Sequence, residues 1–238
     1  MLWAQTRTET MLTLRHGEQV LLTVIIPVAL LVALSVTTII PVPEPRVGSA
    51  AARIFALAVI SSAFTGQAIA LGFDRRYGVL KRLAATALPR WLLIGGRVLA
   101  GLAVVALQLV ILSVTALLLG WHPAASGLAW MVLLVVVGTL AFGALGVLLG
   151  GALRAEIVLA LANIVWFVLL LIGGVALGVD SMPGWLATVV HLLPSAALAE
   201  GLQAALVDGT APSLRSVLVL VAWGGAAALL ATKTTRLS

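Results

Sequence analysis

Charged residues and cysteine are the scarcest features of this chain. Only 9% of its 238 residues are charged and none is cysteine, whereas 62% are hydrophobic. Soluble globular domains carry about a quarter charged residues, so this composition excludes a water-soluble domain and indicates a protein that lies in lipid. The absence of cysteine excludes disulfides, thiolate metal sites and covalent haem attachment. The scattered histidines His16, His122 and His191 do not form a metal site either.

Sequence motifs for catalysis and nucleotide binding are missing as well. No Gly-Lys pair occurs, which excludes a Gly-x-x-x-x-Gly-Lys-Ser/Thr phosphate loop. His191 and Ser195 stand four residues apart, but a serine peptidase needs its nucleophile on a strained turn, and no Gly-x-Ser-x-Gly occurs. A proton or cation relay needs ionisable groups inside the membrane, and the predicted spans hold none in their interiors. We therefore expect that the chain is not an enzyme by itself.

Long apolar runs dominate the sequence instead. A bilayer core needs roughly 20 apolar residues per helix. The six predicted spans are residues 21–40, 54–73, 98–119, 128–149, 157–179 and 214–231. The sequence therefore predicts an all-α membrane protein with six transmembrane helices in one domain, residues 21–238. No small-residue cleavage pattern follows the first span, which we interpret as a retained signal anchor.

Basic residues predict the orientation of these spans. With six spans, three basic residues, Arg46, Arg53 and Arg215, lie on one side and eleven on the other. The eleven are Arg7, Arg15, Arg75, Arg76, Lys81, Arg82, Arg90, Arg97, Arg154, Lys233 and Arg236. Because cytoplasmic loops carry the excess of Lys and Arg, the larger set and both termini are expected in the cytoplasm. The net charge of +6 then indicates anionic lipid headgroups as partners and not nucleic acid.

The segment 181–212, between the fifth and last spans, is apolar only in patches. Counting it as a seventh span would put the basic C-terminal residues on the side opposite the other basic loops. We therefore expect this segment on the extracytoplasmic side of the membrane. There it would form short non-spanning helices that dip into the outer leaflet or lie on it. Such helices are allowed where protein or the interface satisfies the backbone.

A few polar residues and glycines lie within the predicted spans. Two interpretations stay open for the polar residues Gln67, Gln108 and Asn163. They form hydrogen bonds between helices, or they line a substrate path. Ser61, Ser62 and Thr65 accompany the first of them, and Ser113 the second. Gly146 and Gly150 form a small-xxx-small face with Gly143 one turn earlier, which predicts close helix packing.

The loop at 74–97 is the longest basic loop of the larger set. Apolar residues recur there at helical spacing, at Leu80, Leu83, Ala84 and Ala87, with Lys81 and Arg82 on the opposite side. This pattern predicts an amphipathic helix at about residues 74–90. It fits an interfacial helix on anionic lipid and equally a docking helix for a cytoplasmic partner.

Three stretches resemble a known family. Residues 73–90, with Arg97 beyond them, resemble the coupling-helix signature of ABC transporter permeases of the type-2 export class, which moves drugs, antibiotics, polysaccharides and lipids. Residues 14–16 and then 26–27 resemble its amphipathic N-terminal helix, here 1–20, leading into a proline-bearing span. Residues 173–174, 182–186, 193–195 and 200–202 resemble its outer region. The chain departs from the family at Thr86-Ala87, where Thr-Pro is usual, so the coupling helix is expected to run a turn longer.

The resemblance implies a permease of the bacterial cytoplasmic membrane that serves export, efflux or antibiotic resistance. It implies two cytoplasmic ATP-binding subunits, which hold ATP and Mg²⁺, and a second permease chain, identical or homologous. This chain would bind no cofactor directly. The alternative function is a membrane assembly or scaffold subunit that moves no substrate.

The resemblance also implies particular site residues. The residues expected to dock the ATP-binding subunit are Arg75, Arg76, Gly78, Leu80, Lys81 and Leu83. Gly78 would permit the turn into the coupling helix. The candidate substrate path consists of Gln67, Gln108 and Asn163.

Overall fold

Helices account for all regular secondary structure in the described part of the chain. The computed structural model describes residues 17–37, 42–79, 82, 90–172, 175 and 182–234. Its helices are α2 (Gly17–Val36), α3 (Arg46–Val59), η1 (Ile60–Gly66), α4 (Gln67–Arg76), α6 (Arg90–Leu118), η2 (Ala125–Gly127), α7 (Leu128–Ala152), α8 (Ala155–Leu171), α9 (Gly184–Val190), α10 (Pro194–Leu206) and α11 (Leu214–Thr234). The prediction of an all-α protein is confirmed. The predicted N-terminal helix and most of the predicted coupling helix lie outside the described residues.

Four described helices are long and apolar enough to cross a bilayer. They are Arg46–Arg76, which joins α3, η1 and α4, and Arg97–Leu118, Ala125–Ala152 and Leu214–Lys233. Two shorter apolar helices, Val24–Val36 and Ala155–Leu171, lie at the predicted first and fifth spans. The helix lengths therefore support the second, third, fourth and sixth predicted spans.

The segment between α8 and α11 contains a bent helix pair. The axes of α9 and α10 differ by 89°, and together the two helices are long and apolar enough for a broken span or a re-entrant loop. The expectation that they do not span the membrane stays a prediction. The fifth predicted span reaches residue 179, whereas α8 ends at Leu171.

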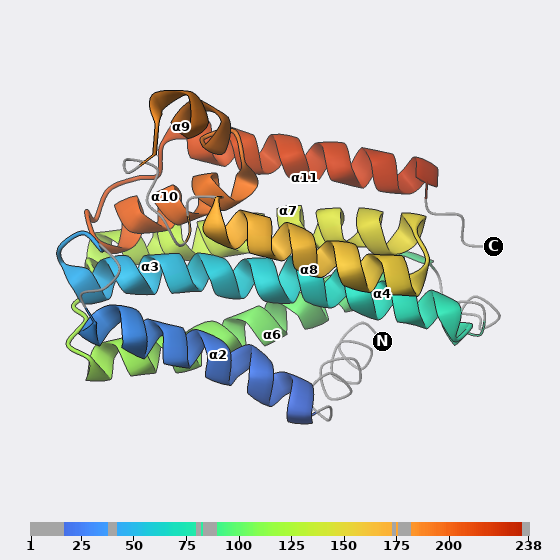
Figure 1. The fold of residues 1–238 in the computed structure, drawn as a ribbon, viewed down its shortest axis with the longest axis horizontal. Helices are drawn as coiled ribbons and strands as arrows, with labels where there is room; N and C mark the ends of the chain where they lie inside the picture. Colours follow the sequence, from blue (N-terminus) through green and yellow to red (C-terminus); the bar gives the residue numbers. More distant parts are fainter. Residues whose placement is uncertain are drawn as a thin grey trace.

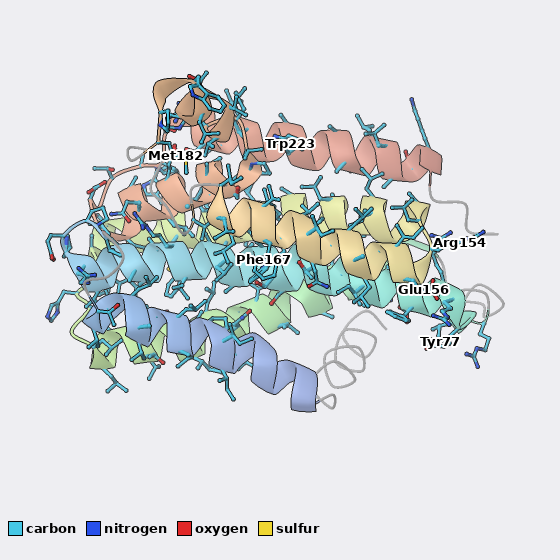
Figure 2. The ribbon with its side chains drawn as sticks, viewed as in Figure 1. Tyr77, Arg154, Glu156, Phe167, Met182 and Trp223 are labelled. Atoms are coloured by element: carbon cyan, nitrogen blue, oxygen red, sulfur yellow. The ribbon has the colours of Figure 1, made fainter. Side chains whose placement is uncertain are left out.

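Successive long helices run in opposite directions, so the bundle has two distinct ends (Figure 1). The ends of α4, α7 and α11 and the beginnings of α6 and α8 share one end, which we call the basic end. Figure 2 shows Tyr77, Arg154 and Glu156 there, far from Met182 beside α9. The described basic residues at the basic end are Arg75, Arg76, Arg82, Arg90, Arg97, Arg154 and Lys233. Alternation of the helices thus groups these residues as the charge pattern predicts.

The second span begins earlier than its hydropathy predicts. The helix begins at Arg46 and not at Ile54. Pro45, at the N-cap, has an extended ψ of 122°. The Arg46 N–H, which has no partner within the helix, donates a hydrogen bond of 2.8 Å to Glu44 Oε2. Arg53 therefore lies inside the helix, with only 8% of its surface exposed. The predicted boundary at Ile54 is therefore not a helix boundary, and a charged side chain lies within the long helix Arg46–Arg76.

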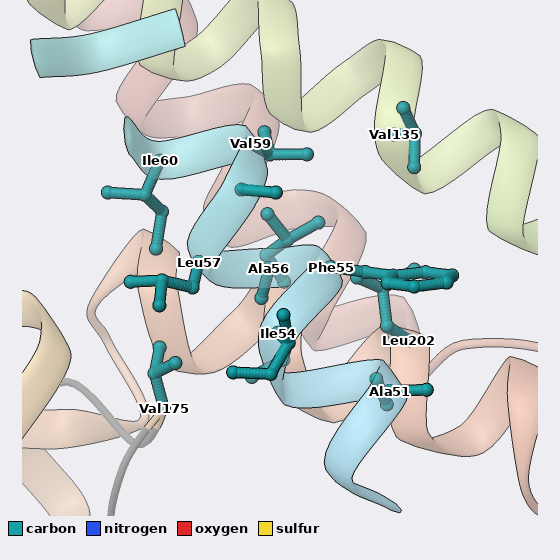
Figure 3. Packing of buried hydrophobic residues seen from close by; sticks show 14 of the residues in the cluster. Ala51, Ile54, Phe55, Ala56, Leu57, Val59, Ile60, Val135, Val175 and Leu202 are labelled. Carbon is teal, nitrogen blue, oxygen red and sulfur yellow. The ribbon is translucent and has the colours of Figure 1, made fainter. Parts of the chain in front are cut away.

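The largest hydrophobic cluster surrounds α3. Figure 3 shows Phe55 and Ile54 of α3 with Leu202 of α10 and Val135 of α7 nearby. The ring of Phe55 meets that of Trp121 edge to face, with centroids 5.7 Å apart. Aromatic contacts of this kind stabilise a fold by more than the burial of their surface alone. The contact between Phe55 and Trp121 therefore helps to hold α3 at the centre of the bundle.

Glycines bring α7 against the second span. A Cβ on Gly146 would lie 2.7 Å from the Phe64 carbonyl oxygen, and one on Gly150 would lie 2.5 Å from that of Ala68. These backbones touch because glycine has no side chain, which is how helices pack closely without a hydrophobic drive. The packing prediction is confirmed at these two glycines and wrong at Gly143, which has nothing described within 4 Å of its Cβ position.

Candidate functional site

The last residues of α4 bind three other helices at the basic end. Arg75 Nη1 donates to the carbonyl oxygens of Gly150 at 3.0 Å and Leu153 at 3.3 Å, and also to that of Gly151. An α-helix leaves its last carbonyls without intrahelical partners, and a cation there also suits the negative end of the helix dipole. The Arg75 guanidinium thus caps the C-terminus of α7.

The neighbouring Arg76 pairs with α8. Its Nη1 forms an ion pair with Glu156 Oε1, in the first turn of that helix. The two side chains are 50% and 62% exposed, so water screens the pair and it stabilises little. The guanidinium carbon of Arg76 also lies 5.9 Å from the centre of the Tyr77 ring.

The third contact joins α4 to α6. Asp74 Oδ2 forms an ion pair with Arg97 Nη2, and these side chains are 28% and 25% exposed. This pair is less screened than the one between Arg76 and Glu156, because it lies deeper between the helices. We call Asp74, Arg75 and Arg76 the junction.

Immediately beyond the junction the chain turns. Gly78 has a φ of 68°, in the left-handed region that favours glycine, as the prediction of a turn at this residue requires. The Arg82 N–H donates to the Gly78 carbonyl at 3.1 Å, and Arg82 Nη2 donates to that of Tyr77 at 3.0 Å. The Tyr77 ring stacks on Phe73, with centroids 6.0 Å apart. The beginning of the loop is thus held against the end of α4.

The docking residues predicted from the sequence are only partly described. Leu80, Lys81 and Leu83 lie outside the described residues, whereas Arg75, Arg76 and Gly78 lie at the end of α4 and just after it. The docking role of all six stays a prediction. Of the described ones, Arg75 already uses its guanidinium within the chain, which sequence reasoning missed because its carbonyl partners carry no side-chain signal.

A seam of hydrogen-bonding side chains runs through the middle of the bundle, around the π-helix η1. Ser62 Oγ donates to Gln108 Oε1 of α6 at 2.8 Å, and Trp166 Nε1 of α8 donates to Ser61 Oγ at 2.7 Å. Gln108 is 2% exposed. Gln108 therefore takes part in a hydrogen bond between helices, and its place in a substrate path stays a prediction. Trp166 is not among the residues predicted from the sequence, although an indole N–H in an apolar helix generally needs a partner.

Gln67 and Asn163 differ in their surroundings. The Gln67 amide nitrogen lies 3.1 Å from the Cβ position of Gly101, so Gln67 and Gln108 share the α6 interface. Asn163 is exposed on α8 and its Nδ2 donates to the Leu159 carbonyl of the same helix at 2.8 Å. The structure thus brings two of the three candidate path residues to one interface.

An ionic cluster lies at the opposite end of the bundle from the junction. Glu200 of α10 binds His191 Nδ1 through Oε1 at 2.7 Å and accepts from Arg215 Nη2 of α11 through Oε2 at 2.9 Å. Ser195 is fully buried and its hydroxyl has no hydrogen-bond partner in the described part of the chain. His191 therefore contacts an ionic network, not the hydroxyl four residues away.

The bundle, its apolar exterior and its basic end define a multi-pass membrane protein whose helices are joined by charges at their ends. The family model of the ABC-2 type transporter matches residues 2–207, and the chain belongs to that family. No match is found among curated proteins. The resemblance of the chain to this family is thereby confirmed, and the chain is the membrane component of an ABC transporter, a class that associates with an ATP-binding subunit.

Proposed function

We propose that this chain is the permease of an ATP-driven exporter and that its ATP-binding subunits dock at the basic end. The observation that carries the proposal is the loop after α4, which begins at Tyr77, directly after three residues that bind α6, α7 and α8. A docked subunit that moved this loop would move the helices with it. Because the family supplies no catalytic domain within the permease, ATP and Mg²⁺ would be bound by the partner.

The proposed orientation places the basic end and both termini in the cytoplasm of a bacterium. It is supported by the grouping of basic residues at that end, since positive residues are retained on the cytoplasmic side. The proposed complex contains two ATP-binding subunits and a second permease chain, identical or homologous. Anionic lipids would surround the basic end.

Within the permease, the seam around η1 is the proposed translocation path. Gln67 and Gln108 support it because polar groups between helices are costly in lipid unless they have a partner or a function. Asn163 contributes from the exposed face of α8, where a second permease chain would bring it against another helix.

Docking is tested by charge reversal in the full chain. The permease is purified from native membranes and its copurified ATP-binding subunit is detected by photolabelling with azido-ATP. Replacing Lys81 and Arg82 together with glutamate should abolish the labelled partner. Arg154→Glu is the matched control, because Arg154 is exposed at the same end and forms no ion pair within the described residues. If the unaltered chain retained no labelled partner, the scaffold alternative would stand.

Orientation is tested with single cysteines, since the natural chain has none. Thr210, between α10 and α11, and Glu156, in the first turn of α8, are both exposed, and they lie at opposite ends of the bundle because α11 begins at the end opposite the basic end. In intact cells, an impermeant maleimide should label Thr210→Cys and leave Glu156→Cys unlabelled. The reverse labelling would overturn the proposed orientation.

A further inference from the structure

The junction joins one short stretch of chain to three separate helices. Asp74, Arg75 and Arg76 follow one another, yet they bind α6, α7 and α8 in turn. We infer that these three residues transmit movement of the loop to the bundle and do not themselves bind the ATP-binding subunit. The inference rests on the proposed function, because the movement originates in that subunit.

Movement of the loop must first reach the end of α4. The stacking of Tyr77 on Phe73 and the two hydrogen bonds from Arg82 bring the beginning of the loop against the last turn of α4. The guanidinium of Arg76 lies beside the same Tyr77 ring. A displacement of the loop therefore acts directly on the junction.

From the junction, α7 and α8 receive the displacement together. Arg75 holds the last carbonyls of α7, and a Cβ on Gly150 would already collide with the α4 backbone. On the other side, a Cβ on Gly72 would lie 3.4 Å from Val158 of α8. Because close-packed interiors transmit strain, α4, α7 and α8 respond as one unit at this end.

The connection to α6 depends on different contacts. Near the basic end, the described side-chain bond between α4 and α6 is the ion pair of Asp74 with Arg97. Both partners are largely buried between helices, where an unpaired charge is costly. Breaking this pair should free α6 from the movement of α4 and leave the loop surface itself unchanged.

The test exchanges the two charges. Arg97→Asp leaves Asp74 facing a second carboxylate, and the double variant Asp74→Arg with Arg97→Asp restores an ion pair. Each is purified with its ATP-binding subunit and reconstituted in liposomes. A cysteine at His122, which is exposed just beyond the end of α6 that lies opposite the junction, reports the response of α6 through its rate of maleimide labelling with and without MgATP.

The single variant should keep azido-ATP labelling of its partner at the unaltered level and lose the MgATP-dependent change in the maleimide rate. The double variant should regain that change. Arg154→Asp, the control at the same end, should behave like the unaltered chain. If Arg97→Asp does not insert, Arg97→Gln carries the same expectations with a neutral side chain.

Two results would overturn the inference. One is a normal MgATP response in the single variants, which would show that the ion pair transmits nothing. The other is loss of the ATP-binding subunit from them while Arg154→Asp retains it, which would make the junction part of the docking surface. An unaltered chain without a labelled partner would instead overturn the proposed function.

Discussion

Replacing Gly150 by alanine should loosen the contact between α7 and the second span. The new Cβ would lie 2.5 Å from the Ala68 carbonyl oxygen and 3.1 Å from Leu71 Cβ, whereas ordinary contact begins at 3.4 Å. A backbone oxygen cannot rotate away as a side chain could. The two helices must therefore separate by roughly 1 Å at this point.

The magnitude of the destabilisation has two parts. Overpacking of this kind typically costs about 1–3 kcal/mol. The separation also stretches the 3.0 Å hydrogen bond from Arg75 to the Gly150 carbonyl, and a hydrogen bond to a charged group is worth about 1.5–3 kcal/mol. Because alanine is favoured over glycine in helices by about 1 kcal/mol, which offsets part of this cost, we expect a net loss of about 2–4 kcal/mol, which lowers the Tm by at least about 4 °C for a chain of this size.

Thermal unfolding in detergent, followed by tryptophan fluorescence, measures this effect. The control is Gly143→Ala in the same helix, since nothing described lies within 4 Å of that Cβ position. The control should not lower the Tm, because alanine is favoured over glycine in helices by about 1 kcal/mol. Equal Tm values for Gly150→Ala and Gly143→Ala would refute the argument from backbone contact.

Two further predictions use the same unfolding assay. Gly224→Ala should lower the Tm because its Cβ would lie 2.9 Å from Ala141 Cα, whereas Gly225→Ala, its neighbour with open space, should not; a reversed order would contradict the observed packing of α11 on α7. Ser62→Ala removes the hydrogen-bond donor to the buried Gln108 side-chain oxygen. We expect it to lower the free energy of unfolding by about 0.6 kcal/mol, the average for hydrogen bonds between membrane helices. A cost below the error of the assay would mean that water replaces the lost donor.

Sequence reasoning found the positions of the helices better than their ends. The predicted second span begins at Ile54 because a hydropathy argument treats Arg53 as a boundary, yet the helix begins at Arg46. The three alanines before Arg53 and the apolar residues Ile54 and Phe55 after it continue the helix, and the fold buries Arg53. Tertiary packing thus overrides the local signal of a charge.

Some features of the junction and its loop can likewise be predicted from the sequence, and others cannot. A basic loop after α4 can be predicted from charge pattern and spacing, and Gly78 from its residue type. The partners of Arg75 cannot, because they are backbone carbonyls 75 to 78 residues further along the chain. The opposite charges of Asp74 with Arg97 and of Arg76 with Glu156 are visible in the sequence, but their pairing follows only from the antiparallel order of the helices.

The second span also belongs to two packing units. Its half farther from the basic end, α3, packs on α2 and α10, and its half nearer the basic end, α4, packs on α7 and α8. Between them lies η1, a π-helix of seven residues, and such segments are rare and frequently occur at functional sites. Two hydrogen bonds join η1 to other helices: Ser61 accepts one from Trp166, and Ser62 donates one to Gln108. The polar seam therefore lies where the two packing units meet, so a displacement of α4 relative to α3 would act first on these two bonds.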